Sequence, residues 1–169
     1  MTLVGPEDPA SQESVIGLHL QDTVTWKGRV SYEESLRCIS EDSVCILAEG
    51  SLKEGIYLPS KVADYAVAGN AILALSPTPG VVADMLPCRG LVRVDPHDVP
   101  AIGDAIGHFY QLYKSGGLQR ERLTDEFINQ FTPARVADTF LRAVRGVIPA
   151  LPDGQNAYAD QGRTMESAA

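Results

Sequence analysis

The sequence predicts an α/β fold in which helices flank a parallel sheet. Two short, continuous apolar runs, Val44–Ala48 and Ala71–Leu75, support this prediction, and Leu91–Val94 predicts a further strand. Strands without polar alternation are typical of parallel sheets that are covered on both faces. Segments with helical spacing of apolar residues lie between these runs, and alternating strands and helices indicate a parallel sheet with helices on both faces.

The first forty residues predict two further strands and a helix. Thr2–Val4 is short and apolar and ends at a Gly-Pro pair, like the tail of a strand. Glu7–Glu13 is a polar loop or the start of a helix, and Val24–Trp26 is a β-prone run. Ser31–Glu34 has the Ser-x-x-Glu pattern of a capping box, so a helix is expected to follow it.

The segment from residue 59 to 75 predicts a helix that leads directly into a buried strand. Pro59 suits a helix start because its φ is fixed and it lacks an N–H group. Ser60 is expected to cap the exposed N–H groups of the first turn. Gly69 can adopt the left-handed conformation that ends a helix, just before the apolar run begins.

The rest of the chain predicts three more helices. Val81–Leu86 indicates one or two helical turns, and a turn at Asp95–Asp98 leads into a longer helix. Apolar residues of that longer helix recur at helical spacing: Ile102, Ile106, Phe109 and Tyr113. A last helix begins at Thr132-Pro133, with Val136, Phe140 and Val144 on one face. We expect one domain over residues 1–148 and a disordered tail over 149–169.

Composition and charge limit the possible function. The chain has 169 residues, enough for one domain with a proper core, and its net charge is −8. An acidic protein with an isoelectric point of about 4.8 repels phosphate backbones, so general nucleic-acid binding is not expected.

Cysteine content and hydropathy indicate a cellular compartment. The three cysteines lack CxxC spacing, which favours free buried thiols in a reducing cytoplasm over disulfides or zinc. No apolar run has the length of a transmembrane helix, and no signal-peptide pattern is present at the N-terminus. The expected location is the cytoplasm, with the inner face of the membrane as an alternative for a peripheral protein.

The predicted topology brings three loops to one edge of the sheet. Parallel α/β sheets bind ligands at the carboxyl ends of their strands, where the loops 27–31, 49–60 and 76–81 should meet. Lys61 and Asp64 lie in the first turns of the helix that begins at this edge. A helix start with these side chains can hold a phosphorylated or hydroxyl-rich ligand. In the structural alternative, Lys61 is a solvated charge and Asp64 only favours the helix dipole.

The same helix resembles the donor-binding helix of a known enzyme family. Its pattern Pro59-x-Lys61-x-x-Asp64-Tyr65-x-x-x-Gly69, followed by an apolar strand, is similar to the retaining GT-B glycosyltransferases related to sucrose and mannosyl transferases. The resemblance implies a Rossmann-like fold, the C-terminal half of a GT-B enzyme. It also implies that Asp64, where the family usually has Glu, holds the ribose hydroxyls of a nucleotide sugar.

Other segments match the same family in order and spacing over residues 1–148. The turn at Gly28–Ser31 resembles the one whose main chain holds the base, and Pro77–Gly80 resembles a loop close to the sugar diphosphate. Leu91–Asp98 and the helix after Gln130 resemble the segments that close the nucleotide domain. The donor-binding residues implied by the resemblance are Asp64, Lys61, Ser60, Gly28, Arg29, Val30, Ser31, Glu54, Thr78 and Gly80.

Two departures from the family pattern affect the expected activity. Many relatives carry a second Glu that contacts the transferred sugar, and Ile56 fills that place here, with Glu54 nearby. The family's acceptor domain and the Arg/Lys loop that neutralises the diphosphate are not found in this sequence. Stabilising the leaving diphosphate is a large catalytic term, so we expect an incomplete or inactive enzyme as an isolated chain. The cations near the predicted edge are Lys61, Lys53 and Arg29.

The leading hypothesis is a hexosyltransferase domain that binds a nucleoside diphosphate sugar and needs no metal or other cofactor. Its sugar or lipid acceptor would be held by a domain on another chain, and no catalytic residue is assigned. A non-catalytic nucleotide-binding or docking subunit is the alternative from a different class. A sugar-nucleotide epimerase shares the fold, but it needs catalytic carboxylates and His from two domains.

Overall fold

The computed structural model describes residues 1–41, 43–50 and 52–147 of the chain. The chain divides into two compact units, Met1–Phe131 and a second unit that begins at Thr132. The expected tail over 149–169 lies outside the described residues, so both the tail and the domain boundary at residue 148 stay predictions.

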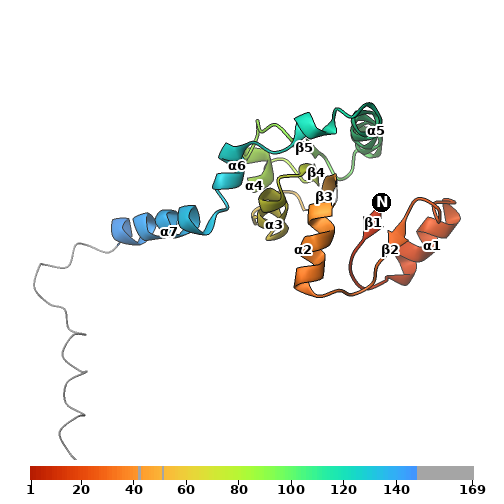
Figure 1. The fold of residues 1–169 in the computed structure, drawn as a ribbon, viewed down its shortest axis with the longest axis horizontal. Coiled ribbons are helices and arrows are strands. Elements are labelled where there is room, and N and C mark those ends of the chain that lie inside the picture. The colour runs from red at the N-terminus through yellow and green to blue at the C-terminus, as the bar shows by residue number, and fades with distance from the viewer. Residues whose placement is uncertain (42, 51, 148–169) are drawn as a thin grey trace, which may run out of the picture. The chain divides into compact units, whose positions relative to one another are not determined.

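The first unit begins with a small β-α-β segment. Strand β1 (Thr2–Leu3) pairs in parallel with β2 (Thr25–Trp26), and helix α1 (Pro9–Gly17) connects them. Helix α1 buries none of its residues. In Figure 1, β1, α1 and β2 are the orange-red segment next to the N-terminus. The strands predicted at Thr2–Val4 and Val24–Trp26 are therefore confirmed as short strands.

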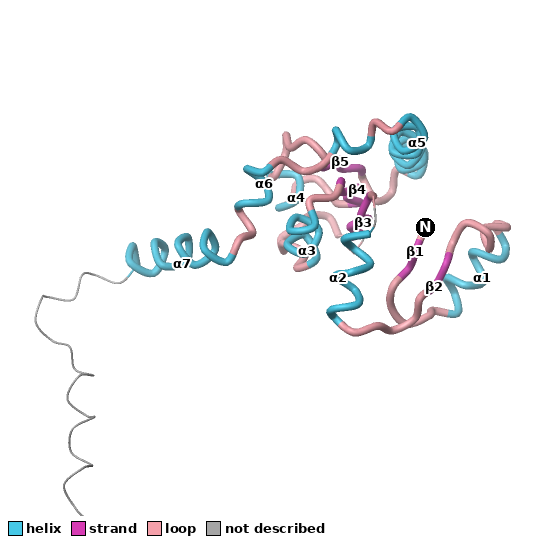
Figure 2. Tube along the Cα trace, in the orientation of Figure 1, coloured by secondary structure: helices cyan, strands magenta, loops and turns pink. Residues whose placement is uncertain are grey.

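A three-stranded parallel sheet forms the centre of the first unit. Its strands, in the order β3-β4-β5, are Val44–Ala48, Ala71–Leu75 and Leu91–Val94, the ranges that the sequence predicts. Figure 2 shows β3, β4 and β5 in magenta, with helices around them. The sequence predicts one sheet, but the structure has two, because β1 and β2 span two residues each and pair only with one another within the described chain.

Helices cover both faces of this central sheet. One face packs against α3 (Lys61–Ala68), α4 (Val81–Asp84) and α6 (Asp125–Asn129), through side chains such as those of Val62, Val82 and Phe127. The other face packs against α5 (Val99–Ser115) and the 3₁₀ turn Leu118–Glu121. Helix α2 (Tyr32–Glu41) contacts α3. A parallel sheet between helices is confirmed for this part of the chain.

The predicted helix caps form in part. Ser31 accepts a hydrogen bond from the Glu34 N–H at 3.1 Å, which is one half of the capping box. The Glu34 carboxylate instead pairs with Arg37 at 2.6 Å, an ion pair that lowers the Glu34 pKa mainly through the hydrogen bond. Ser60 does not cap α3 with its side chain, because its own backbone is already helical, so this prediction is wrong. Gly69 ends α3 in the left-handed conformation, with φ 70°, as predicted.

Helix α5 has two apolar sides. Phe109 is buried against the sheet, and Ile102 packs beside it. Ile106 and Tyr113, which the sequence places in the same helical pattern, are exposed. The core-facing side is completed by Ala101, Ala105 and Leu112, so the second apolar side is not needed to cover the sheet.

The second unit contains helix α7 (Pro133–Val147), which begins where the sequence predicts. Thr132 accepts a hydrogen bond from the Arg135 N–H at 3.4 Å, and Arg142 pairs with Asp138 at 2.8 Å. Val136 and Phe140 are exposed on this helix. Among the described residues, no helix is both long enough and apolar enough to cross a bilayer.

Candidate functional site

The carboxyl edge of the central sheet brings three polar residues together. Ala48, Leu75 and Val94 end their strands in register with one another. The residues that follow them are Glu49, Ser76 and Asp95. The parallel register therefore places these three side chains on one edge, although they are 19 to 46 positions apart in the sequence.

Glu49 and Ser76 form the buried part of this edge. Ser76 has no exposed surface, and its hydroxyl donates a hydrogen bond to Oε2 of the half-buried Glu49. Arg93 donates from Nη1 to the Ser76 carbonyl at 2.7 Å. Glu49 was not among the candidates taken from the sequence. A charged residue directly after a continuous apolar strand is the signal that could have found it.

Two glycines join the loops that the sequence predicts at this edge. Gly55 and Gly80 form an isolated parallel bridge: the Val81 N–H donates to the Gly55 carbonyl at 2.8 Å. A Cβ on Gly80 would lie 3.1 Å from Cα and N of Gly55, so the backbones approach too closely for a larger residue to fit without a shift. The bridge brings Glu54 and Thr78, both predicted site residues, onto neighbouring loops, and both are exposed.

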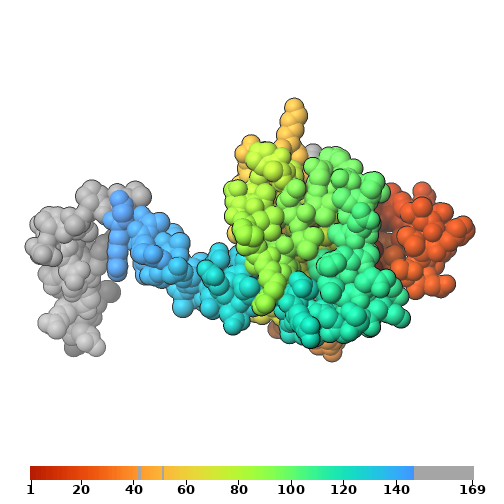
Figure 3. All heavy atoms as spheres, turned by 90° about the horizontal axis from the view of Figure 1, so that it is seen from above, coloured from red at the N-terminus to blue at the C-terminus, as the bar shows by residue number. Residues whose placement is uncertain are grey.

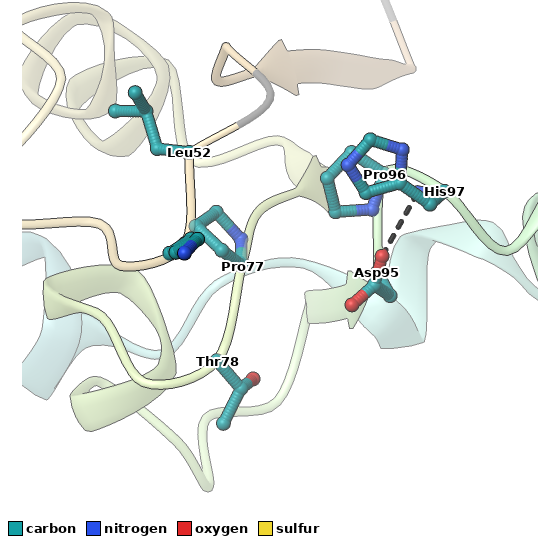
Figure 4. Close-up of a pocket in the computed structure, with 7 residues that line it drawn as sticks. Leu52, Pro77, Thr78, Asp95, Pro96 and His97 are labelled. Atoms are coloured by element: carbon teal, nitrogen blue, oxygen red, sulfur yellow. Dashed lines mark hydrogen bonds between the residues drawn. The ribbon is translucent and has the colours of Figure 1, made fainter.

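An open pocket of about 280 Å³ lies between these loops and the end of β5. Figure 4 shows Leu52, Pro77 and Thr78 on one side and Asp95, Pro96 and His97 on the other, and Lys53 completes the lining. The His97 N–H donates to Asp95 Oδ1 at 2.8 Å, which fixes the turn before α5. An ammonium group and a hydroxyl are thus available here to a polar ligand.

Asp64 lies in the first turn of α3 and is half-buried. The Tyr32 hydroxyl, from the first residue of α2, donates to Asp64 Oδ1 at 3.0 Å. The pKa of Tyr32 is raised by this hydrogen bond and by the negative charge of Asp64. Because α3 follows β3 and leads back to the start of β4, its first turn lies toward the carboxyl edge. Asp64 is therefore accessible on the side where the sequence predicts it.

The other predicted residues on this side are mostly exposed. Ser60 and Lys61 are exposed at the start of α3, and the Ser60 hydroxyl is not used as a cap. Gly28 has φ 71°, the left-handed conformation that a glycine turn requires, and its carbonyl accepts from Gly5 at 2.9 Å. Arg29 and Ser31 are exposed, whereas Val30 is half-buried.

The predicted residues form two groups: the loops around Gly55 and Gly80 meet at the carboxyl edge of the β3–β5 sheet, whereas the 28–31 turn follows β2 of the other sheet. One group surrounds the Tyr32–Asp64 hydrogen bond, next to the 28–31 turn, and the other surrounds the Gly55–Gly80 bridge. Asp64, Lys61 and Ser60 do not line the 280 Å³ pocket. In the described part of the chain, no group of three or more His, Cys, Asp or Glu side chains could hold a metal ion.

No family model, no curated protein and no solved structure matches this chain.

Proposed function

We propose that this chain is the donor-binding domain of a GT-B glycosyltransferase and binds a nucleoside diphosphate sugar. The observation that carries the proposal is the position of Asp64, a half-buried carboxylate at the first turn of α3, held through Oδ1 by Tyr32. The Tyr32 hydroxyl engages Oδ1 of this carboxylate, so Oδ2 can accept a hydrogen bond from a ribose hydroxyl. Hydrogen bonds to charged groups are among the stronger ones, which suits recognition of a diol.

Positive charge around this carboxylate supports binding of the diphosphate. The N–H groups of Val62 and Ala63 donate to the carbonyls of Pro59 and Ser60, so they are not free to bind an anion. The exposed ammonium of Lys61, the partial positive charge of the helix start and the Ser60 hydroxyl are then the groups proposed to attract phosphate. In the described residues Lys61, Arg29 and Lys53 take part in no ion pair.

The proposed reaction is transfer of a hexose, with retention, to a sugar or lipid acceptor held by a separate domain. The turn from Gly28 to Ser31 would hold the base through its main chain. Thr78, Gly80 and Glu54 would lie near the sugar diphosphate, on the loops joined by the Gly55–Gly80 bridge. Glu49 is the additional carboxylate at this edge that could contact the transferred sugar. The reaction is proposed to need no metal and to take place in the cytoplasm.

Calorimetric titration of the full chain with UDP, GDP and ADP tests the proposal. We expect heat of binding with at least one nucleotide. Asp64→Ala should weaken that binding by about 1.5–3 kcal/mol, roughly 10- to 150-fold, because a charged hydrogen bond is lost. Tyr32→Phe keeps the ring but removes the hydroxyl that holds Asp64, so we expect a smaller loss of nucleotide affinity than with Asp64→Ala.

Asp104→Ala is the matched control, since it removes an exposed carboxylate from α5 and leaves the α3 region unchanged. No heat with any of the three nucleotides would contradict the proposal. Equal weakening by Asp64→Ala and Asp104→Ala would show that Asp64 acts only through overall charge.

A second candidate function, a non-catalytic nucleotide-binding or docking subunit, is favoured by one observation. Ile46, in the middle of the edge strand β3, is 38% exposed. Exposed apolar area on a sheet face is typical of an interaction surface. A sugar-transfer assay in the presence of a separate acceptor-domain chain distinguishes the candidates: a catalytic donor domain supports transfer, whereas a non-catalytic subunit binds the nucleotide without transfer.

A further inference from the structure

Two nucleophilic side chains, those of Lys27 and Cys38, are in direct contact although they lie eleven positions apart in the sequence. Lys27 directly follows β2, and Cys38 belongs to α2. Nζ of Lys27 donates a hydrogen bond to Sγ of Cys38 at 3.2 Å. Lysine has a flexible four-carbon side chain, so its amine can move onto the sulfur without a change in the backbone. The contact therefore brings together two groups that one covalent bond can join.

The surroundings of Cys38 favour its oxidation. Cys38 is 5% exposed, but the Lys27 side chain in contact with it is exposed, so a small oxidant can approach the sulfur along the lysine. A second cation lies nearby: the pKa of Arg37 is raised mainly by the hydrogen bond to Glu34, and in smaller part by Cys38. Positively charged surroundings are typical of cysteines that react with peroxides.

We propose that Lys27 and Cys38 form a reversible sulfenamide cross-link, an Nζ–Sγ bond, when the protein meets hydrogen peroxide. In the first step Sγ of Cys38 attacks the peroxide: an S–O bond forms, the O–O bond breaks, and water leaves, which gives a sulfenic acid. Sulfenic acids condense with nearby nitrogen atoms. In the second step the neutral Lys27 amine attacks the sulfur: the S–N bond forms, the S–O bond breaks, and the hydroxide leaves as water with a proton of the amine.

The atoms and electrons of this reaction balance. One thiol, one amine and one hydrogen peroxide give one sulfenamide and two water molecules. The sulfur loses two electrons, and these reduce the peroxide. A dithiol such as dithiothreitol reverses the reaction, because it supplies two hydrogen atoms that restore the thiol and the amine while it closes to a cyclic disulfide. The site therefore responds to the redox state of its surroundings.

The charge of Lys27 determines the order of the two steps. Its pKa is raised by the hydrogen bond to Cys38 and by the negative charge of the Cys38 thiolate, and in smaller part by Glu34 and Glu41 of α2. The amine is therefore protonated while the thiolate is present, and a protonated amine cannot attack. Oxidation to the uncharged sulfenic acid removes the thiolate charge, so Lys27 then loses its proton more readily and the second step can follow.

The cross-link would join two parts of the first unit. On one side is the β1–α1–β2 segment, shown by the red atoms in Figure 3, in which each strand spans two residues and α1 buries none. On the other side is α2, which contacts α3 beside the central sheet. A covalent link between Lys27 and Cys38 restricts the unfolded chain and should stabilise the first segment, as loop-closing disulfides do. The cross-link does not depend on the proposed nucleotide binding.

Mass spectrometry of the full chain tests the proposal. The reduced protein is treated with hydrogen peroxide at mildly alkaline pH, its remaining thiols are blocked, and it is digested with trypsin. We expect a protein lighter by two hydrogen atoms and a linked pair of the peptides 1–29 and 38–53, since trypsin does not cleave after a modified Lys27. Dithiothreitol should separate the pair. The thermal midpoint of the oxidised protein should exceed that of the reduced protein.

Lys27→Arg is the decisive variant, because it keeps a positive charge beside Cys38 but replaces the amine by a guanidinium that is always protonated. It should abolish the linked pair and the rise in thermal midpoint, while a sulfenic acid at Cys38 can still be trapped. Lys53→Arg, at an exposed lysine elsewhere in the chain, is the matched control and should keep the linked pair. Cys88→Ala should keep it as well, since the Cys88 thiol donates to the Arg89 carbonyl and not to Lys27.

Three results would overturn the proposal. One is a peroxide-treated protein in which Cys38 is unmodified. Another is oxygen added to Cys38 without any linked peptides. The third is a Cys38–Cys45 disulfide, which has the same mass loss but lies within the single peptide 38–53 and would persist in Lys27→Arg.

Discussion

Two β-α-β segments of this chain share a connection but differ in what they bury. In the first, α1 joins β1 to β2, and in the second, α3 joins β3 to β4, with parallel strands in both cases. Strand β4 buries four of its five residues, and α3 buries Val62 and Ala66. The strands of the first segment span two residues each, and α1 buries none.

The difference teaches that the connection alone does not stabilise a parallel pair. Helix α3 lies over one face of the sheet while α5 covers the other, so β4 loses contact with water on both sides. Apolar burial of this kind is the main favourable term in the free energy of folding, and a pair of strands without it has only marginal stability. The candidate site accordingly lies at the edge of the β3–β5 sheet, where the polar side chains rest on a packed layer.

The largest expected effect comes from one apolar deletion made in each segment. Ile72 in β4 is fully buried, whereas Ile16 in α1 is 57% exposed. Ile72→Ala should lower the free energy of unfolding by about 2–5 kcal/mol, because it leaves a cavity in the core. Ile16→Ala should change it by less than about 0.5 kcal/mol. Urea denaturation followed by circular dichroism measures both. Similar losses for the two variants would mean that the first segment is packed as tightly as the second.

A medium effect is expected at the glycines that end the two helices. Gly69 ends α3 with φ 70°, whereas Gly17 is the last residue of α1 and has no positive φ. Gly69→Ala should cost about 1–2 kcal/mol of stability from backbone strain. Gly17→Ala should be neutral or stabilise by about 0.5 kcal/mol, since a Cβ there meets open space. Thermal unfolding measures both changes, and a destabilising Gly17→Ala would contradict this distinction.

The smallest effect is a pH dependence of the first segment. The pKa of Asp8 is lowered by hydrogen bonds from the Ser11 side chain and backbone, because Asp8 caps α1. A lowered pKa in the folded state contributes stability above about pH 3.8, the ordinary value, and this contribution is lost as the pH falls through the folded value. The protection factors of the α1 amides, which are measured relative to the intrinsic exchange rate at each pH, should therefore fall in acid. Asp8→Asn retains a capping oxygen, so its α1 protection factors should depend less on pH. An identical pH dependence in both proteins would exclude this role for Asp8.

The central fold could be predicted from local sequence patterns, and the reason is physical. A strand that is covered on both faces needs apolar residues at every position, so Ala71–Leu75 predicts a buried strand without knowledge of its neighbours. The end of α3 is equally local, since the left-handed conformation at Gly69 needs a residue without Cβ. The prediction that Ser60 caps α3 was wrong, because the backbone of Ser60 already has helical dihedral angles.

The candidate site could be predicted only for residues whose position depends on their own segment of the sequence. Asp64 was placed at a helix start from its own segment, but Tyr32, which holds it, lies 32 positions earlier. The Glu49–Ser76 hydrogen bond joins two strand ends across 27 positions, and neither residue is unusual on its own. Such pairs depend on the register of the sheet, which no local pattern contains.

The sequence by itself determined the three central strands and the helices between them, because periodicity and helix-end residues act over a few positions. The tertiary structure decided which apolar residues became core: Phe109 is buried on α5, while Ile106 on the same helix is exposed. Both residues are apolar at helical spacing, and only the position of the sheet on one side of the helix distinguishes them. It also decided the separation into two sheets, since strand pairing depends on which backbones meet in space.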